Sequence, residues 1–395
     1  MKLFDSLAIL GVDILSGKCG YTFLYTFSLV SFCILNMIPK NFISIKDQYI
    51  KNEMYMDSFF HKNLLSKRNI QIFRPYKFLN RSKLVKYFYY KFISYKVLSF
   101  FTVFILILFS YIKSLFKKRL LIVNSNNILF VHSEKCVLLY NSIHPGSNYL
   151  TVNLSKNNSF GTHTSQYLDN LTLFILFIFC VKLIIKSYRN CSVYIINHYD
   201  IYDTICFAQL LSNQNSNKKI NFFITSHYDR WSYLLSCYSN SNSNIIQHGF
   251  LSQNLNIPYK LSHINTIYIT NNKFIDDFNM YIKKVNEYIL FTYKLKFKHF
   301  KFNNKNTIIL VISSVHNFKH EEDLLHRLSL GGNYNLIYKL HPVYMNLNNN
   351  LPDSVIIVDK SYIFPTCDLV LHSGSYLAYE YFSNGIKISH LKDFN

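Results

Sequence analysis

The chain is poor in the residues that break, cross-link or punctuate proteins. Its 395 residues include only 10 glycines and 7 prolines, well below the usual shares of about 7% and 5%, which excludes collagen-like and Gly-rich linker proteins. The eight cysteines form no CxxC pair. That spacing disfavours a disulfide framework or a zinc site and is typical of reduced, buried thiols in a cytosolic protein. The motifs GxxxxGK[ST], GxGxxG and HExxH are also absent, which argues against P-loop hydrolases, dinucleotide enzymes and zinc proteases.

Acidic residues are scarce as well. The chain has 42 Lys and Arg against 21 Asp and Glu, a formal net charge of +21. Such a charge attracts polyanions, so a non-enzymatic protein that binds an acidic membrane or nucleic acid is one alternative. The lysines are spread along the chain and no nucleic-acid module is recognisable, so we expect no nucleic-acid partner. The first 16 residues carry two aspartates and no basic segment, and we predict no secretory signal there.

Three uncharged apolar runs raise the question of membrane contact. Cys19–Pro39 is long enough to span a bilayer, Val97–Ile112 is shorter, and Asn170–Val181 fits a buried helix better. A basic cluster directly follows the second run: Lys113, Lys117, Lys118 and Arg119. Basic residues beside an apolar helix attract anionic headgroups by about 1 kcal/mol each. We predict peripheral attachment to the cytoplasmic face of the plasma membrane rather than a true span. Three core helices are the alternative.

The pattern of apolar and polar residues changes at residue 119. Residues 1–118 are aromatic and basic with no clear alternation. Strands are predicted beyond them at Leu120–Val123, Ile128–His132, Ser192–Asn197, Asn221–Thr225, Asn244–Gln247 and Thr266–Thr270, with helices at Thr204–Leu211, Arg230–Tyr238 and Lys273–Lys284. Apolar strands that alternate with helices indicate a parallel sheet covered on both faces. We assign this alternation to a domain over residues 119–292.

The alternation restarts after a basic stretch at 293–305, which we interpret as a linker. In residues 306–395 the predicted elements are strands Thr307–Ile312, Asn335–Leu340, Ser354–Val358, Asp368–Leu371 and Ile386–Ser389, and helices Glu321–Leu330 and Tyr376–Phe382. The expected fold is therefore α/β: two doubly wound, Rossmann-like domains that face a cleft. A basic, apolar N-terminal region of uncertain structure precedes them.

Three predicted strands are each followed directly by a histidine. These are His248, His341 and His372. Ligands of open α/β sheets bind beyond the carboxyl ends of the strands, so these positions are the strongest candidates for a site. A single His-Gly or His-Pro dipeptide is commonly structural, and the prediction depends on the three occurring together.

The last of these strands leads into a Ser-Gly-Ser loop. Ser373, Gly374 and Ser375 precede a helix that carries Glu380. Backbone N–H groups, hydroxyls and the positive end of a helix dipole together fit a phosphate. A nearby histidine such as His341 can donate to a phosphate oxygen or protonate a leaving group. Glu380 could accept hydrogen bonds from ribose hydroxyls.

The first domain supplies the candidate bases. His248 would face the cleft from the opposite wall and act as a general base toward an acceptor hydroxyl. The tripeptide HYD follows two predicted strands and ends at Asp200 and Asp229, and either carboxylate is an alternative base. Asp229 also precedes the helix that begins at Arg230, and capping that helix is the more usual role for such a residue.

Together these motifs resemble a known family. Gln247-His248-Gly249, Lys339-Leu340-His341-Pro342, and Ser373-Gly374-Ser375 with Glu380 and Gly385 look like the motifs of the bacterial surface-polysaccharide transferases of the GT-B fold. That group includes capsule and polysialic acid glycosyltransferases and the CDP-glycerol glycerophosphotransferases of teichoic acid synthesis. The resemblance covers residues 192–388, about half of the chain.

The resemblance implies a glycosyltransferase. It implies inverting, metal-independent transfer of a sugar from a nucleotide-activated donor to a glycan or lipid-linked acceptor of a capsule or lipopolysaccharide type, with no cofactor beyond the donor. It also implies donor contacts from His341, Ser373, Ser375 and Glu380, with His248 near the reacting centre. A CDP-polyol phosphotransferase of the same fold is the enzymatic alternative.

Overall fold

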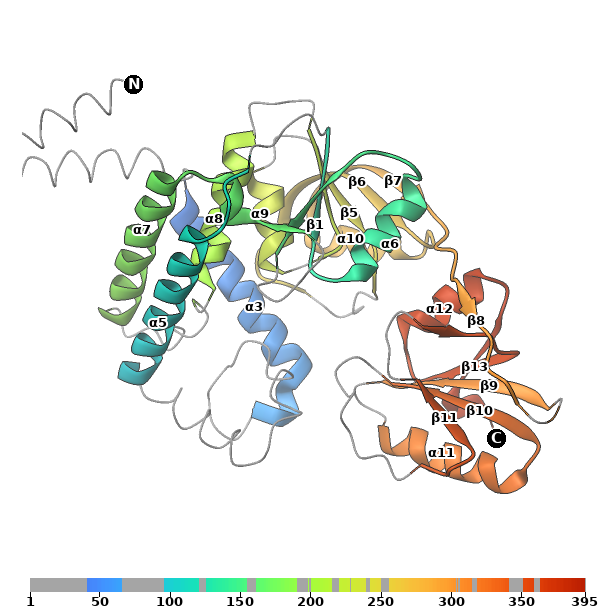
Figure 1. The fold of residues 1–395 in the computed structure, drawn as a ribbon. Helices are drawn as coiled ribbons and strands as arrows, with labels where there is room; N and C mark the ends of the chain where they lie inside the picture. Colours follow the sequence, from blue (N-terminus) through green and yellow to red (C-terminus); the bar gives the residue numbers. More distant parts are fainter. Residues whose placement is uncertain are drawn as a thin grey trace, which may run out of the picture.

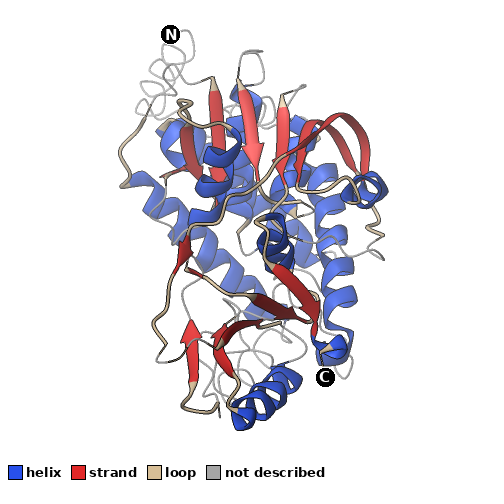
Figure 2. Cartoon of the chain, turned by 90° about the vertical axis from the view of Figure 1, so that its right-hand side faces the viewer, coloured by secondary structure: helices blue, strands red, loops and turns tan. Residues whose placement is uncertain are grey.

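The structure is a computed structural model. It describes residues 41–65, 96–120, 126–154, 161–189, 198, 200–214, 220–227, 229–238, 242–249, 256–302, 304, 306–314, 318–340, 351–358 and 363–394. Within these ranges the chain forms an α/β fold built on parallel sheets (Figures 1 and 2). The α/β class predicted from the alternation of strands and helices is therefore confirmed.

The larger sheet has seven strands in the order β3-β2-β1-β4-β5-β6-β7. Its strands are β1 Asn127–Val131, β2 Leu150–Asn153, β3 Thr162–His163, β4 Asn221–Ile224, β5 Ser243–Ile246, β6 Leu261–Ile269 and β7 Ile282–Leu290. Every neighbouring pair is parallel. The strand order reverses between β1 and β4, which makes that position a topological switch point.

Helices cover this sheet. They are α3 Phe42–Leu65, α5 Lys96–Leu115, α6 Glu134–Ile143, the short 3-10 helix η2 Thr164–Tyr167, α7 Asn170–Arg189, α8 Ile201–Gln214, α9 Arg230–Tyr238 and α10 Phe274–Tyr281. In α8, every residue from Ile201 to Leu211 is buried. Helices α5 and α7 pack on each other and on α8, and they lie at the edge of the molecule away from the C-terminal sheet (Figure 1).

The smaller sheet has five parallel strands in the order β11-β10-β9-β13-β14. They are β9 Thr307–Ile312, β10 Tyr334–Lys339, β11 Val355–Val358, β13 Leu369–His372 and β14 Lys387–His390, accompanied by α11 Phe318–Gly331, α12 Tyr376–Ser383 and the 3-10 helix η5 Leu391–Asp393. Its switch point lies between β9 and β13. A separate two-stranded ladder joins β8 Phe297–Lys298 to β12 Phe364–Pro365.

The predicted elements of the second half agree closely with the structure. Strand Thr307–Ile312 and helix Arg230–Tyr238 have the predicted bounds. The strand was predictable because a continuous buried run rich in β-branched residues favours an extended conformation. The predicted strand Ser192–Asn197 and most of Leu120–Val123 lie outside the described residues. The predicted linker contains β8.

One prediction was wrong. The predicted helix Lys273–Lys284 ends at Tyr281, and Ile282 begins the edge strand β7. Lys283, Lys284 and Glu287 are exposed there. Charged side chains on an edge strand protect its unpaired backbone from other chains, and here they mimic the polar face of a helix in the sequence.

Candidate functional site

Histidines gather at the switch point of the larger sheet. His132 follows β1, His227 lies three residues beyond β4, and His248 lies two residues beyond β5. The ring centroids of His227 and His248 are 4.6 Å apart, and those of His132 and His248 are 5.7 Å apart. The prediction that His248 lies at the carboxyl end of its strand is confirmed. His227 was noted in the sequence only as the first residue of the second HYD tripeptide, and His132 only as the end of a predicted strand; neither was given a role.

His227 holds the backbone of His248 in place. The backbone N–H of His248 donates to Nε2 of His227 at 3.1 Å, so the proton of the neutral His227 ring is on Nδ1. Burial lowers the pKa of His227 to about 3, despite an opposing hydrogen bond with the backbone of Ile246. His227 is therefore neutral at physiological pH and acts as a fixed acceptor.

His248 is also kept neutral. Burial lowers its pKa well below the ordinary value, and repulsion from His227, His132 and Lys135 lowers it further, against an opposing hydrogen bond with the backbone of Thr225. Its Nδ1 is buried and makes no hydrogen bond to any described residue. A neutral imidazole with an unused nitrogen has a lone pair or an N–H available for a ligand that enters the site.

A cysteine with an acidic thiol lies beside these histidines. Sγ of Cys136, in the first turn of α6, is 3.0 Å from Oγ1 of Thr225 and 3.7 Å from Nδ1 of His132. Burial raises the pKa of Cys136, but the hydrogen bonds and charge of His132, with the hydroxyls of Ser133 and Thr225, outweigh burial and lower the pKa to about 6. A thiolate is therefore favoured near neutral pH. No sequence motif indicated this pair.

The two candidate aspartates have structural roles. Arg230 is fully buried, and its Nη1 pairs with Oδ1 of Asp200, while Nε and Nη2 bind the carboxylate of Glu53 on α3 at 2.7 and 2.6 Å. Asp229 accepts from the backbone N–H groups of Trp231 and Ser232 at 3.0 and 3.2 Å. Asp229 thus caps α9, as expected, and Asp200 is committed to a buried ion pair.

The Ser-Gly-Ser loop lies at the switch point of the smaller sheet. Gly374 has φ +92°, a left-handed conformation that glycine adopts without strain, and its N–H donates to Nδ1 of His372 at 3.0 Å. Oγ of Ser373 donates to Oε1 of the buried Glu321 at 2.8 Å, and Ser314 contributes its backbone N–H to the same carboxylate. The loop is thus fixed from inside by Glu321, a residue that the sequence did not indicate.

The part of this loop that can bind a ligand is Ser375 together with the first turn of α12. Ser375 is the N-cap residue of α12, and its side chain makes no cap hydrogen bond. The Ser373 proton and the Gly374 N–H are already used within the loop. The groups directed to an anion are therefore the Ser375 hydroxyl and the N-terminal N–H groups of α12, which carry the positive end of the helix dipole.

Residues beyond the carboxyl ends of the two sheets contact each other. Nζ of Lys135, in the first turn of α6, donates to Oε1 of Glu380 on α12 at 2.7 Å. Oγ1 of Thr270, directly after β6, is 2.9 Å from the hydroxyl of Tyr376, the first residue of α12. Lys273 lies over the ring of Tyr379, 3.7 Å from its centroid. The two switch points therefore border one region of the molecule.

The side chain of Glu380 is buried in the contact between α6 and α12. Its side chain is 1% exposed, its Oε2 makes no hydrogen bond to any described residue, and burial raises its pKa against the pull of Lys135 and Lys339. The carboxylate faces the larger sheet's Lys135 and not solvent. The predicted contact with a ribose is therefore not what this structure shows.

Two expectations for the site have no structural test. His341 lies outside the described residues, so its place beside the Ser-Gly-Ser loop stays a prediction. Within the described residues, no three or more His, Cys, Asp or Glu side chains are grouped so as to hold a metal ion. Metal-independent chemistry likewise stays a prediction.

No protein-family model matches this chain, and no curated protein matches it.

Proposed function

We propose that the protein is a glycosyltransferase that moves a sugar from a nucleotide-activated donor to a surface-polysaccharide acceptor, with inversion and without a metal. The observation that most supports the proposal is the meeting of two parallel-sheet switch points. Ligands of such sheets bind at switch points, and here the histidines of one sheet and the Ser-Gly-Ser loop of the other border the same region through Lys135–Glu380 and Thr270–Tyr376. Such a meeting is what a two-domain GT-B enzyme requires, with donor and acceptor on opposite walls, and it supports the proposal.

The donor phosphates are assigned to the start of α12. Ser375 and the N–H groups of the first turn of α12 would donate to phosphate oxygens, and the dipole of α12 favours the negative charge that grows on the leaving nucleotide. His341 would complete the site from the end of β10. Glu321 and Gly374 hold the loop in shape and do not touch the donor.

The acceptor is assigned to the side of His248. The acceptor oxygen forms its bond to the anomeric carbon as the bond from that carbon to the phosphate oxygen breaks, and the electron pair leaves with the nucleotide. The acceptor proton passes to the neutral imidazole of His248. His227 acts as a positioning residue, because it fixes the backbone of His248.

A nucleotide screen tests the donor assignment first. Thermal unfolding of the full chain would be followed with CMP, CDP, UDP and GDP. A nucleotide at 100 times its Kd should stabilise the protein by about 2.7 kcal/mol, and Ser375→Ala should weaken the binding of that nucleotide. If none of the four nucleotides stabilises the chain, the proposal fails.

His248→Ala tests the catalytic assignment. With the donor of the nucleotide that binds and an oligosaccharide acceptor mixture, we expect nucleotide release to fall by about 10²–10⁴-fold while nucleotide affinity is unchanged. His263→Ala is the matched control, because His263 lies on β6 and bonds Asn286 instead. Turnover of His248→Ala equal to that of the control would make His248 structural.

A further inference from the structure

Helix α5 exposes a continuous apolar face. Besides Leu115, six exposed large apolar side chains recur along it every three or four residues: Val97, Phe101, Ile105, Phe109, Ile112 and Phe116. That spacing places them on one face of the helix, and Phe116, just past the end of α5, is 86% exposed. We name these six residues the α5 stripe. An apolar strip of this length on a surface marks a contact with a partner or a membrane.

The opposite face of α5 is part of the protein. Val103 and Ile107 are fully buried, and Oγ of Ser114 is 3.0 Å from the hydroxyl of Tyr202 on the buried helix α8. Both α5 and α7 are long and apolar enough to span, but α5 packs along its length on α7 and α8. The α5 stripe is therefore the exposed face of a helix that is otherwise packed on the protein, the arrangement in which an amphipathic helix lies along a membrane surface.

Basic residues flank both ends of the α5 stripe. The ring of Tyr111 stacks on Phe177 with centroids 4.5 Å apart, and Phe100 contacts Tyr188 at 5.1 Å, so α5 and α7 run antiparallel. Exposed basic side chains thus lie at the two ends of the pair: Lys113 and Lys118 at one end, and Lys186 and Arg189 at the other.

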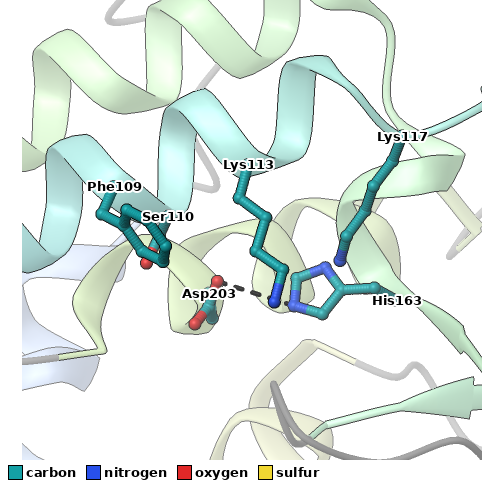
Figure 3. A pocket seen from close by; sticks show the side chains of 6 residues that line it. All are labelled: Phe109, Ser110, Lys113, Lys117, His163 and Asp203. Atoms are coloured by element: carbon teal, nitrogen blue, oxygen red, sulfur yellow. Dashed lines mark ion pairs between the residues drawn. The ribbon is translucent and has the colours of Figure 1, made fainter.

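A pocket joins the apolar stripe to the basic end. Phe109 of the α5 stripe lines it together with Ser110, Lys113, Lys117, His163 and Asp203. In Figure 3 the side chain of Lys113 extends toward Asp203 and His163, that of Lys117 ends beside His163, and Phe109 lies on the opposite side of the pocket. The carboxylate of Asp203 lies 3.6 Å from Nε2 of His163. Two lysine ammonium groups that share a pocket with an exposed phenylalanine form a seat for a phosphate attached to an acyl chain.

We propose that the α5 stripe docks, in the plane of the membrane, on a bilayer that contains anionic lipid, with Lys113 and Lys117 against lipid phosphates. The charge of the chain selects this occupant. A second copy of a protein with net charge +21 would bring lysines against lysines around the α5 stripe. An anionic bilayer instead buries the apolar face among acyl chains and pairs the basic ends with lipid phosphates. The proposal is independent of the glycosyl-transfer activity.

Vesicle sedimentation of the full chain tests the docking. The protein would be mixed with vesicles of phosphatidylcholine alone, or of equal parts phosphatidylcholine and phosphatidylglycerol. We expect sedimentation with the anionic vesicles and much less with the neutral ones. Phe101→Asp/Phe109→Asp should lower the partition coefficient by about tenfold or more, because two apolar side chains no longer enter the bilayer. Leu330→Asp is the matched control, because Leu330 is 89% exposed on α11 and should leave partitioning unchanged.

A second variant tests the basic end of the α5 stripe. Lys113→Glu/Lys117→Glu should reduce sedimentation with anionic vesicles and leave the weak sedimentation with neutral vesicles unchanged. Lys319→Glu/Lys387→Glu is the control, because both lysines are exposed elsewhere, and it should reduce sedimentation with anionic vesicles less. Circular dichroism confirms that each variant is folded.

Three results would overturn the proposal. The first is wild-type protein that stays in the supernatant with anionic vesicles. The second is a lipid-free dimer that Phe101→Asp/Phe109→Asp converts to a monomer, which would assign the α5 stripe to a second copy. The third is resistance of the cellular protein to extraction with high salt and alkaline carbonate, which would mean that the apolar helices span the bilayer.

Discussion

Lys135→Met would remove the charged hydrogen-bond partner that a buried carboxylate, Glu380, has across the two sheets. The Glu380 side chain is 1% exposed and that of Lys135 is 34% exposed. Breaking a fully buried pair costs about 3–5 kcal/mol, because the remaining charge is left without compensation. Since Lys135 is a third exposed, solvent already screens part of the interaction, and we expect a loss of about 2–3 kcal/mol in the free energy of unfolding near neutral pH.

The loss should depend on pH in a definite direction. Burial raises the pKa of Glu380, and Lys135 opposes that rise. Without Lys135 the pKa of folded Glu380 rises further above its unfolded value. A carboxyl with a raised folded pKa contributes its stability below the unfolded pKa and loses it as the pH climbs through the folded pKa. The deficit of Lys135→Met should thus be small near about pH 4 and grow on the way to neutrality, by at most about 1.4 kcal/mol per pH unit.

Urea unfolding measures this deficit. The chain has one tryptophan, Trp231, which is buried in α9, so its fluorescence reports the larger-sheet region. Lys319→Met, an exposed lysine on α11, is the control. The double variant Lys135→Met/Glu380→Met should recover to within about 1–2 kcal/mol of wild type, because no buried charge remains. A Lys135→Met deficit equal to the control, or one that does not change with pH, would refute the reasoning.

Two further predictions concern polar side chains of the larger-sheet domain. Arg230→Met leaves Glu53 and Asp200 as neighbouring buried carboxylates and should lower the free energy of unfolding by about 3–5 kcal/mol, measured by urea denaturation; a loss under about 1 kcal/mol would show that the ion pairs contribute little. Asp229→Ala removes the cap of α9 and should cost about 1 kcal/mol in the same assay without changing turnover. A large loss of turnover with normal stability would instead make Asp229 a base.

Much of the fold was predictable because its signals are local. The strands β9 and β13 and the helices α9 and α12 follow from short runs of apolar or β-branched residues. Gly374 was likewise predictable from the sequence as part of a loop that precedes a helix. The edge strand β7 was not, because the spacing of its charged residues Lys283, Lys284 and Glu287 imitates the polar face of a helix. The strands β2 (Leu150–Asn153) and β3 (Thr162–His163) were not predicted, since neither contains a continuous run of apolar residues.

The candidate site was also predictable only where its signals are local in the sequence. The strand-end rule located His248 and the loop at Ser373–Ser375 because the direction of a parallel strand fixes which edge its last residue reaches. The sequence by itself thus determined the α/β class and which residues stand at the carboxyl ends of the sheets. Only the tertiary structure decided which charges meet. Arg230 binds Glu53 across 177 positions and Lys135 binds Glu380 across 245, since such pairs form only where the packing of sheets and helices brings distant side chains within hydrogen-bond reach.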